Sequence, residues 1–246
     1  MKVISKTLSA LLAAAVLFSA LMLGSPVTAL SPYAMTGEQW TQYWAAVKDD
    51  NTLIALTPGS DESQMNFSWH SGLFAGCPCV RVSQSPDMSG AVPFYGRAEY
   101  AEVLGQRVNK VTVTGLEEDT LYYYTCRGDN GFTAAAPFRT RSSGSFKLLF
   151  VSDIQCSSSD TDDSVREACA RSWQNTLASA LGANEDISFI IAAGDNTNAG
   201  KTSEWIAALS PPALRSLPLA TAVGNHDMKT TVYSRYVNNP NSYLGK

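Results

Sequence analysis

Six polar side chains follow three apolar segments in the second half of the chain, and their types are suited to metal-assisted chemistry. In chain order they are Asp153 and Gln155, then Asp195, and finally Asn225, His226 and Asp227. Carboxylate and amide oxygens bind hard and borderline divalent cations. A histidine can donate a proton near neutral pH. This set therefore predicts a site for one cation, or for a pair of cations that share Asp195.

The apolar segments that precede these residues are typical of buried parallel strands. Residues 146–153, 187–195 and 217–227 are apolar runs of strand length, as expected for central strands covered on both faces. The spacing of apolar residues predicts a helix over 164–181, after two N-terminal acids, and a shorter helix over 202–209. The order β-α-β-α-β implies parallel strands, and ligands bind beyond the carboxyl ends of such strands.

The first half of the chain has a different pattern. Residues 51–141 contain short segments rich in Val, Tyr, Thr and Phe, separated by Gly, Pro, Asp and Asn, which predicts a small antiparallel β-sandwich. Strands are expected within 52–60, 64–71, 79–85, 109–116 and 121–140. In the lead-in of residues 30–50, Thr36 is expected to cap a short helix. The residues that share one face of this helix are Trp40, Tyr43, Trp44 and Val47.

The first 29 residues have the features of a secretory signal peptide. Lys2 and Lys6 precede a nearly unbroken apolar stretch over 8–23, and the small residues at 27–29 suit a signal peptidase. We therefore expect a secreted, extracellular protein. The alternative is an uncleaved anchor that holds the protein at the cell surface, although a membrane span needs about 20 apolar residues and this stretch is shorter.

Composition and charge restrict the partners. The chain is 45% hydrophobic and 16% charged, which is typical of a globular protein. Its net charge is -4, and removal of residues 1–29, which hold two lysines and no acid, changes this to -6 because -4 - 2 = -6. A negative surface repels nucleic acid and anionic lipid. We expect neither a nucleic-acid partner nor stable membrane association after signal cleavage, and the oligomeric state stays open.

The odd number of cysteines leaves their pairing open. The five are Cys77, Cys79, Cys126, Cys156 and Cys169. Either Cys77 or Cys79 could bridge to Cys126, and Cys156 could bridge to Cys169, because disulfides form outside the cell. The spacing Cys77-Pro78-Cys79 is too tight for a comfortable bridge. No second pair completes a structural zinc site with these two cysteines.

Three motifs resemble a known family. Asp153-Ile-Gln155, Gly194-Asp195 and Gly224-Asn225-His226-Asp227, in this order and each at a strand end, resemble the first three motifs of the calcineurin-like dinuclear metallophosphoesterases. Residues 111–141 resemble the last strands of the sandwich that precedes the catalytic domain in purple acid phosphatases. The resemblance covers roughly residues 51–227. It implies a fibronectin type III-like β-sandwich over 51–141, followed by the first half of an α/β (αββα) metallophosphatase domain over 146–246.

The resemblance also implies a role for each candidate residue. Asp153 and Gln155 would bind one metal ion, Asp195 would bridge two, and Asn225 would bind the second. His226 would donate a proton to the leaving oxygen, and Asp227 would orient His226. The implied substrates are phosphorylated small molecules, chiefly phosphate monoesters, with diesters as a second class.

The sequence departs from the family pattern in two ways. Asn198 stands where purple enzymes carry a tyrosine that binds ferric iron, so we expect two divalent ions, Mn, Zn or Fe(II), and no Fe(III)–tyrosine site. The family also supplies three later histidines, but no histidine follows His226. The remaining histidine, His70, lies on an expected sandwich strand and is expected to be structural. We therefore expect an N-terminal fragment of a longer enzyme that is inactive alone.

A non-catalytic function is the alternative. In that interpretation the chain is an exported binding protein whose sandwich contacts a partner or a glycan. The enzyme predicts phosphatase activity that depends on added Mn or Zn, whereas the binding protein predicts no metal dependence and a ligand retained by residues 51–141 alone.

Overall fold

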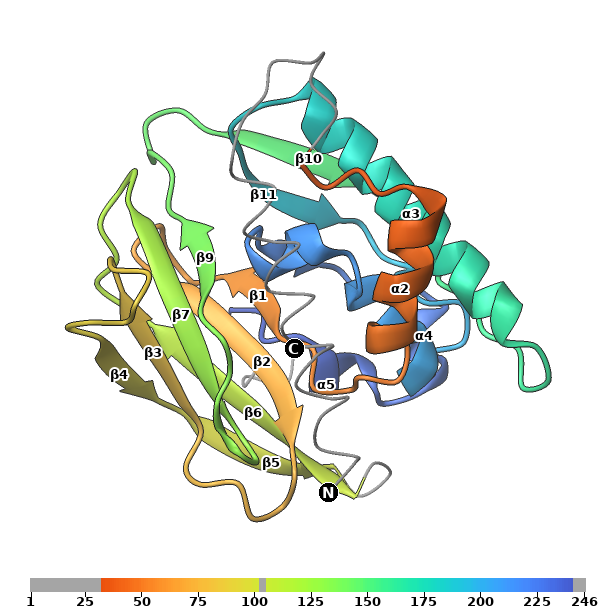
Figure 1. The fold of residues 1–246 in the computed structure, drawn as a ribbon, viewed down its shortest axis with the longest axis horizontal. Coiled ribbons are helices and arrows are strands. Elements are labelled where there is room, and N and C mark those ends of the chain that lie inside the picture. Colours follow the sequence, from red (N-terminus) through yellow and green to blue (C-terminus); the bar gives the residue numbers. More distant parts are fainter. Residues whose placement is uncertain (1–31, 102–104, 241–246) are drawn as a thin grey trace.

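The computed structural model describes residues 32–101 and 105–240, so the expected signal peptide at 1–29 lies outside the described residues. An antiparallel β-sandwich packs against an α/β unit (Figure 1). Among the described residues, none of the helices combines the length and the apolar character that a membrane span requires. The predicted fold class, a β-sandwich followed by an α/β metallophosphatase unit, is confirmed at this level.

Two antiparallel sheets form the sandwich. One has the order β1-β2-β6-β5, with strands Ala55–Pro58, Met65–Ser71, Gln106–Val113 and Arg97–Ala101. The other has the order β4-β3-β7-β8, with strands Val92–Tyr95, Cys79–Ser83, Leu121–Gly128 and Gly131–Phe132, and β9 (Ala136–Arg139) also pairs with β7. Apolar side chains from both sheets, among them Phe67, Val80, Tyr124 and Phe138, form one buried core. This burial is the main stabilising contribution to the sandwich.

Strands β4 and β5 were not among the predicted strands. Most of their residues are exposed, so the sequence lacks the alternation of apolar and polar residues that signals a half-buried strand. Gly96 lies between them, where the chain passes from one sheet to the other. A Cβ atom at Gly96 would lie 2.0 Å from the Lys110 carbonyl oxygen, so the crossing requires glycine.

The lead-in helix forms where the sequence predicts it. Helix α2 spans Gly37–Val47, and the Thr36 hydroxyl accepts a hydrogen bond from the Gln39 amide while the Gln39 side chain accepts one from the Thr36 amide. This reciprocal capping satisfies two backbone donors that would otherwise lack partners. The buried Trp40 and Trp44 then pack the helix against the α/β unit.

The α/β unit has the predicted β-α-β-α-β order. Strands β10 (Lys147–Val151), β11 (Ile187–Ala192) and β12 (Leu219–Thr221) are parallel and adjacent in that order. Helix α3 (Asp163–Ala183), capped by Asp162, joins the first two strands, and α4 (Thr202–Leu209) with η2 (Pro212–Arg215) joins the last two. The short helices η3 (Asp227–Lys229) and α5 (Tyr233–Tyr236) follow.

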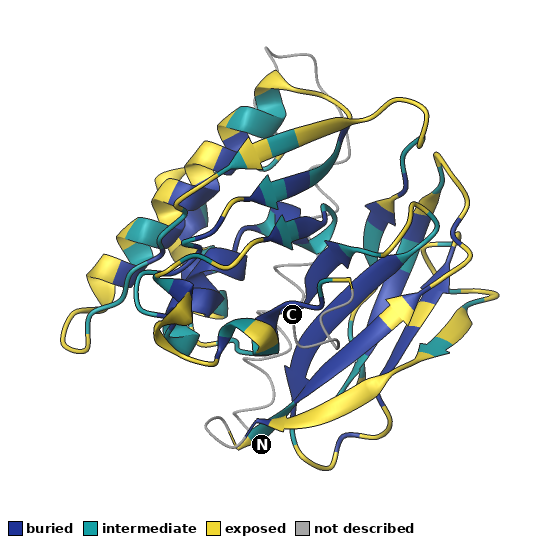
Figure 2. Ribbon diagram, turned by 180° about the vertical axis from the view of Figure 1, so that it is seen from behind, coloured by how far each residue is buried: buried dark blue, intermediate teal, exposed yellow. Residues whose placement is uncertain are grey.

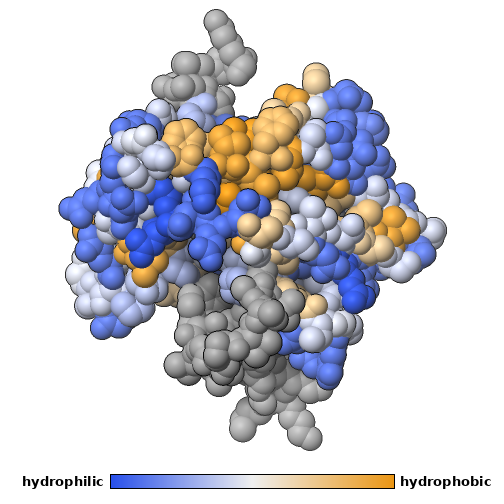
Figure 3. Space-filling view, turned by 90° about the horizontal axis from the view of Figure 1, so that it is seen from above, coloured by the Kyte–Doolittle hydropathy of each residue, from blue (hydrophilic) through white to orange (hydrophobic). Residues whose placement is uncertain are grey.

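The expectation that these strands are covered on both faces is wrong for β10 within the described residues. Leu149 and Val151 pack into the core below the helices, whereas Leu148 and Phe150 point to the opposite face. The Phe150 side chain is 65% exposed. The outer part of the sheet is correspondingly coloured as exposed in Figure 2, and Figure 3, which views the molecule from its β10 side, shows a broad apolar area. A continuous apolar run therefore did not reveal which face is covered.

Buried polar and aromatic contacts join the two units. The ring of Tyr236 in α5 lies 4.6 Å from the ring of His70 in β2, measured between centroids, and stacks on Trp205 of α4 at 5.6 Å. The Asn238 side chain donates to the Phe67 carbonyl at 3.3 Å. These contacts fix the α/β unit against the β1-β2-β6 sheet.

His70 is structural, as predicted, and it makes stability sensitive to acid. Burial lowers the pKa of His70 from its usual 6.5 to about 4, and its Nε2 atom has no hydrogen-bond partner among the described residues. Protonation would leave a buried N–H unsatisfied beside Tyr236 and near Arg235. Since the unfolded chain takes up the proton at higher pH, stability is complete above about pH 6.5 and falls as the pH decreases towards 4.

We expect the free energy of unfolding to fall by up to about 3 kcal/mol over this range on account of His70, at 1.36 kcal/mol per pKa unit. Denaturant unfolding at several pH values measures this loss. His70→Phe keeps an aromatic ring against Tyr236 but cannot titrate. The free energy of unfolding of the wild type should therefore fall relative to that of the variant as the pH falls from 6.5 to 4. Parallel curves would contradict the assignment.

All five cysteines are free thiols in the structure. Cys126 lies opposite Val80 in the β3–β7 pair, so these two side chains share the inner face of the sheet. Cys79 neighbours Val80 in the same strand and therefore points to the other face. A Cys79–Cys126 bridge does not fit this register. Cys156 and Cys169 contribute to one apolar cluster, and a bridge between them stays a prediction.

Candidate metal centre

Backbone hydrogen bonds bring the ends of β10 and β11 together. The Asp153 amide donates to the Gly194 carbonyl at 3.3 Å, and the Gln155 amide donates to the Asp195 carbonyl at 2.8 Å. The Cys156 amide continues this pairing with a hydrogen bond to the Asn196 carbonyl. The candidate residues of the first two motifs are thus neighbours along one edge of the sheet, as the order β10-β11 predicts.

The end of β12 joins the same edge through the Asp195 carboxylate. Its Oδ1 atom accepts a hydrogen bond from the His226 amide at 2.9 Å. A Cβ atom at Gly224 would lie 2.0 Å from this oxygen and 2.2 Å from the Asp195 amide nitrogen. Only glycine permits this approach, so Asp195 lies between the first and third motifs. This is the position that a residue shared by two cations must have.

Three of the candidate residues have backbone conformations that side chains rarely adopt. The φ angles of Asp153, Gln155 and Asp195 are 54°, 42° and 49°. Among the described residues only six non-glycine residues have positive φ, and three of them are candidate ligands. Such conformations cost free energy and concentrate at functional sites. The edge of the sheet therefore maintains this arrangement at the expense of stability.

Most of the candidate ligand oxygens are free of internal partners. Within the described part of the chain, no hydrogen bond involves the side chains of Gln155 and Asn225 or the Oδ2 atom of Asp195, while Asp153 accepts only from the Ser152 hydroxyl. Asp153 and Asn225 are exposed, and Gln155 and Asp195 are half-buried. Oxygens that are accessible and uncommitted can bind a cation, so the donor set fits Mg²⁺-like or Mn²⁺-like ions.

The donor set has few charges. Among the described residues, no three His, Cys, Asp or Glu side chains group together as a metal site. The candidate centre combines two carboxylates with two amides. Cation affinity rises with the number of charged ligands, so these four residues alone predict weak binding.

The His226 ring is oriented by a backbone carbonyl. Its Nδ1 atom lies 2.6 Å from the Asn198 carbonyl oxygen, which can only accept, and 2.9 Å from the Lys229 ammonium, which can only donate, so these two neighbours favour opposite tautomers of the ring. The Nε2 atom is then the nitrogen left for a ligand. The Lys229 ammonium also donates to the Asn198 carbonyl, at 2.9 Å. Sequence reasoning missed Lys229 and the Asn198 carbonyl, because no residue type signals a backbone contact.

Asp227 does not contact the His226 ring, contrary to the role that the resemblance implied. It is fully buried, and its oxygens accept from the amides of Asn196, Thr197 and Gly224 and from the side chains of Asn196 and Thr197, at 2.8 to 3.1 Å. Burial raises the pKa of Asp227, but these hydrogen bonds outweigh that effect and hold the pKa below its usual value. Asp227 joins the loops after β11 and β12.

Replacing Asp227 with Asn is expected to destabilise the chain by about 3 kcal/mol, because the new NH₂ group faces backbone donors that the carboxylate satisfied. Chemical denaturation measures the change. Asp129→Asn is the control, since that carboxylate accepts a hydrogen bond from the Gly72 amide in an exposed part of the sandwich. Equal losses in the two variants would contradict the role of Asp227.

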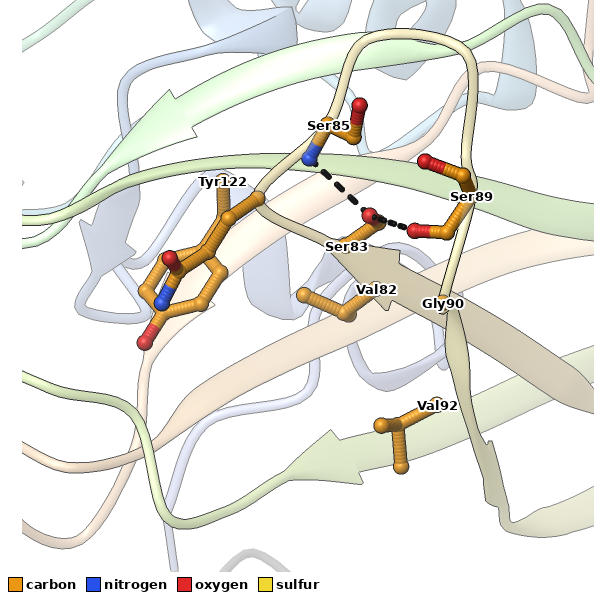
Figure 4. Close-up of a pocket in the computed structure, with 8 residues that line it drawn as sticks. Val82, Ser83, Ser85, Ser89, Gly90, Val92 and Tyr122 are labelled. Atoms are coloured by element: carbon orange, nitrogen blue, oxygen red, sulfur yellow. Dashed lines mark hydrogen bonds between the residues drawn. The ribbon is translucent and has the colours of Figure 1, made fainter.

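A separate groove of about 490 Å³ lies on the sandwich (Figure 4). It is formed by the β3–β4 hairpin, including Ser83, Ser85 and Ser89, together with Tyr122 of β7. The Ser83 hydroxyl donates to the Ser89 carbonyl and accepts from the Ser85 amide, so these groups hold the hairpin. None of the residues that line the groove belongs to the candidate metal centre.

Comparisons with known proteins support the same assignment for both units. Residues 52–140 match the family model of the purple acid phosphatase N-terminal domain, and residues 146–246 match that of the calcineurin-like phosphoesterases. A search of curated proteins found no match.

A search of solved structures found matches, including the following two. A purple acid phosphatase, PPD1, from yellow lupin (Lupinus luteus) seeds has a TM-score of 0.56 and 17% identity, over 71% of this chain and 35% of that chain. A structure of PhoD has a TM-score of 0.42 and 13% identity, over 72% of this chain and 39% of that chain. This chain therefore spans about a third of the length of the lupin enzyme.

The order of the two matches along the chain agrees with the architecture of a sandwich that precedes a phosphoesterase unit. By these two matches, the first unit of the chain is assigned to the purple acid phosphatase N-terminal domain family and the second unit to the calcineurin-like phosphoesterases.

Proposed function

We propose that the chain is part of a metal-dependent phosphoesterase that hydrolyses phosphate monoesters, with diesters as a second class. The observation that carries this proposal is the convergence of uncommitted oxygens at one sheet edge, centred on Asp195. Asp153 and Gln155 would bind one divalent ion, Asn225 a second, and Asp195 both. Bound cations in such a site polarise phosphate oxygens and lower the pKa of bound water.

The residues of this chain have distinct parts in the proposed reaction. The Asn198 carbonyl holds the His226 ring so that Nε2 can meet the leaving oxygen of the substrate. As a water molecule forms a new bond to phosphorus and the ester P–O bond breaks, protonated His226 would donate its Nε2 proton to the leaving oxygen. Lys229 adds a positive charge beside the ring, which favours a phosphate anion.

Two finer points also belong to the proposal. Asn198 in place of a tyrosine favours Mn, Zn or Fe(II) over ferric iron. We further propose that the protein is exported, on the basis of the basic start and apolar stretch within residues 1–29.

Metal binding tests the proposal directly. Free Mn²⁺ at 100 times its Kd should stabilise the chain by about 2.7 kcal/mol, which is measured as a rise in Tm that EDTA reverses. The same measurement is repeated with Zn²⁺. Hydrolysis of p-nitrophenyl phosphate is then assayed with each metal. If neither metal changes Tm at any concentration that the protein tolerates, the metal site is wrong and the exported binding protein becomes the better interpretation.

A further inference from the structure

Glu204 is a fully buried carboxylate on the first turn of α4. Its side chain is 0% exposed, and none of the ion pairs among the described residues includes it. Its Oε1 atom accepts hydrogen bonds from the amide and the hydroxyl of Ser158, each at 3.2 Å. Its Oε2 atom accepts from the amides of Ala199 at 2.7 Å and Lys201 at 3.2 Å. One side chain therefore engages two separate loops.

These two loops carry candidate site residues. Ser158 lies three residues after Gln155, in the loop between β10 and α3. Ala199 directly follows Asn198, whose carbonyl orients the His226 ring at 2.6 Å. The loops also meet through backbone bonds, since the Asn198 amide donates to the Cys156 carbonyl at 3.0 Å. The hydrogen bonds of Glu204 go to Ser158, Ala199 and Lys201, and none goes to a candidate ligand.

The four donors around Glu204 require a side chain that accepts hydrogen bonds through both of its terminal oxygens. Burying a carboxylate is costly unless donors replace the lost water, and here four donors do so. The position in the first turn of an eight-residue helix is also favourable for a negative charge. A glutamine of the same size would turn an NH₂ group towards Ser158 or towards the amides of Ala199 and Lys201, and those contacts would be lost.

We propose that Glu204 is a positioning residue for the candidate metal centre: its carboxylate locks the loops after β10 and β11 together and so holds Gln155 and the Asn198–His226 pair in place. This inference rests on the proposed function only for its catalytic meaning, because the positioning itself is a property of the loops and can be measured without metal.

The chain has only two histidines, which makes the test sharp. In Glu204→Gln, ¹⁵N NMR should show a shift in the balance of the two His226 tautomers, because the Asn198 carbonyl that accepts from Nδ1 is no longer fixed. His70, in the sandwich, should keep its signals. Hydrogen exchange of residues 156–163 and 196–200 should become at least about tenfold faster, while the sandwich strands remain protected. Mn²⁺ binding should weaken by about 10- to 100-fold.

A destabilised control separates positioning from general loss of stability. Thr140→Val removes a buried hydroxyl that bonds the Glu117 carbonyl in the sandwich, and it should lower Tm without changing the His226 tautomer. If Glu204→Gln does not fold, Ser158→Ala removes one of the four bonds and should produce a smaller change in the same loop signals.

The outcomes distinguish the two proposals. An unchanged His226 tautomer together with unchanged loop exchange in the folded variant overturns the role of Glu204. Loop and tautomer changes in a protein whose wild type binds no Mn²⁺ or Zn²⁺ support the positioning role but overturn the metal-dependent function. Equal effects of Glu204→Gln and Thr140→Val on the His226 tautomer also overturn the positioning role.

Discussion

Asp195→Asn is expected to weaken Mn²⁺ binding by more than about 100-fold, because loss of an outer-shell partner alone costs 10- to 100-fold and Asp195 is a proposed direct ligand of both ions. The substitution should leave the fold intact, since the new amide oxygen can still accept the hydrogen bond from the His226 amide that Oδ1 accepts at 2.9 Å. Isothermal titration calorimetry measures the change in Kd, and chemical denaturation confirms the fold.

The other ligands provide a graded comparison for this prediction. Asp153→Asn removes the other carboxylate of the set and should have the next largest effect. Gln155→Ala and Asn225→Ala remove neutral oxygens and should each cost less. If all four variants bind Mn²⁺ as the wild type does, the cations bind elsewhere. If Asp195→Asn has the smallest effect, the shared position of this residue is wrong.

Gly224→Ala is expected to damage both stability and metal binding. The added methyl group would lie 2.0 Å from the Asp195 Oδ1 atom and 2.2 Å from the Asp195 amide nitrogen, so the backbone of one loop must move. Overpacking of this kind costs about 3 kcal/mol, which lowers the Tm of a chain of this size by about 6 to 12 °C. Since the displaced group is the central carboxylate, Mn²⁺ affinity should fall at least about tenfold.

Gly128→Ala is the matched control. A Cβ atom at that position would meet its nearest neighbour, the Gly131 carbonyl oxygen, only at 3.8 Å, which is an ordinary contact. Differential scanning fluorimetry with and without Mn²⁺ compares the two variants. A Gly224→Ala protein with wild-type Tm and wild-type metal response would show that Asp195 and Gly224 do not approach as closely as the structure indicates.

Much of the fold could be predicted because its signals are local in the chain. The Thr36 capping box, the helices α3 and α4 and the β-α-β-α-β order all follow from periodicity and capping within short windows. The exposed strands β4 and β5 were missed because their sequences lack the local alternation of apolar and polar residues that signals a strand. Distant segments decide which face of a strand is covered. The apolar residue type of Phe150 therefore did not show that its side chain is exposed.

For the candidate site, the sequence also predicted one part and missed another. The sequence alone placed Asp153, Gln155, Asp195, Asn225 and His226 at the ends of apolar strands, and the structure brings these ends to one edge of the sheet, while the roles of the residues stay predictions. The partners of these residues could not be predicted. Asp227 was expected at the His226 ring, yet its hydrogen bonds go to Asn196, Thr197 and Gly224.

The sequence by itself determined the types and order of the candidate ligands, because these depend on residue chemistry and on strands that end where the apolar runs end. Only the tertiary structure decided what holds them: the carbonyl that orients His226, the buried carboxylate of Glu204 behind two loops, and the register that separates Cys79 from Cys126. These depend on contacts between residues far apart in the chain, where a hydrogen bond or a shared face is set by packing and leaves no local pattern.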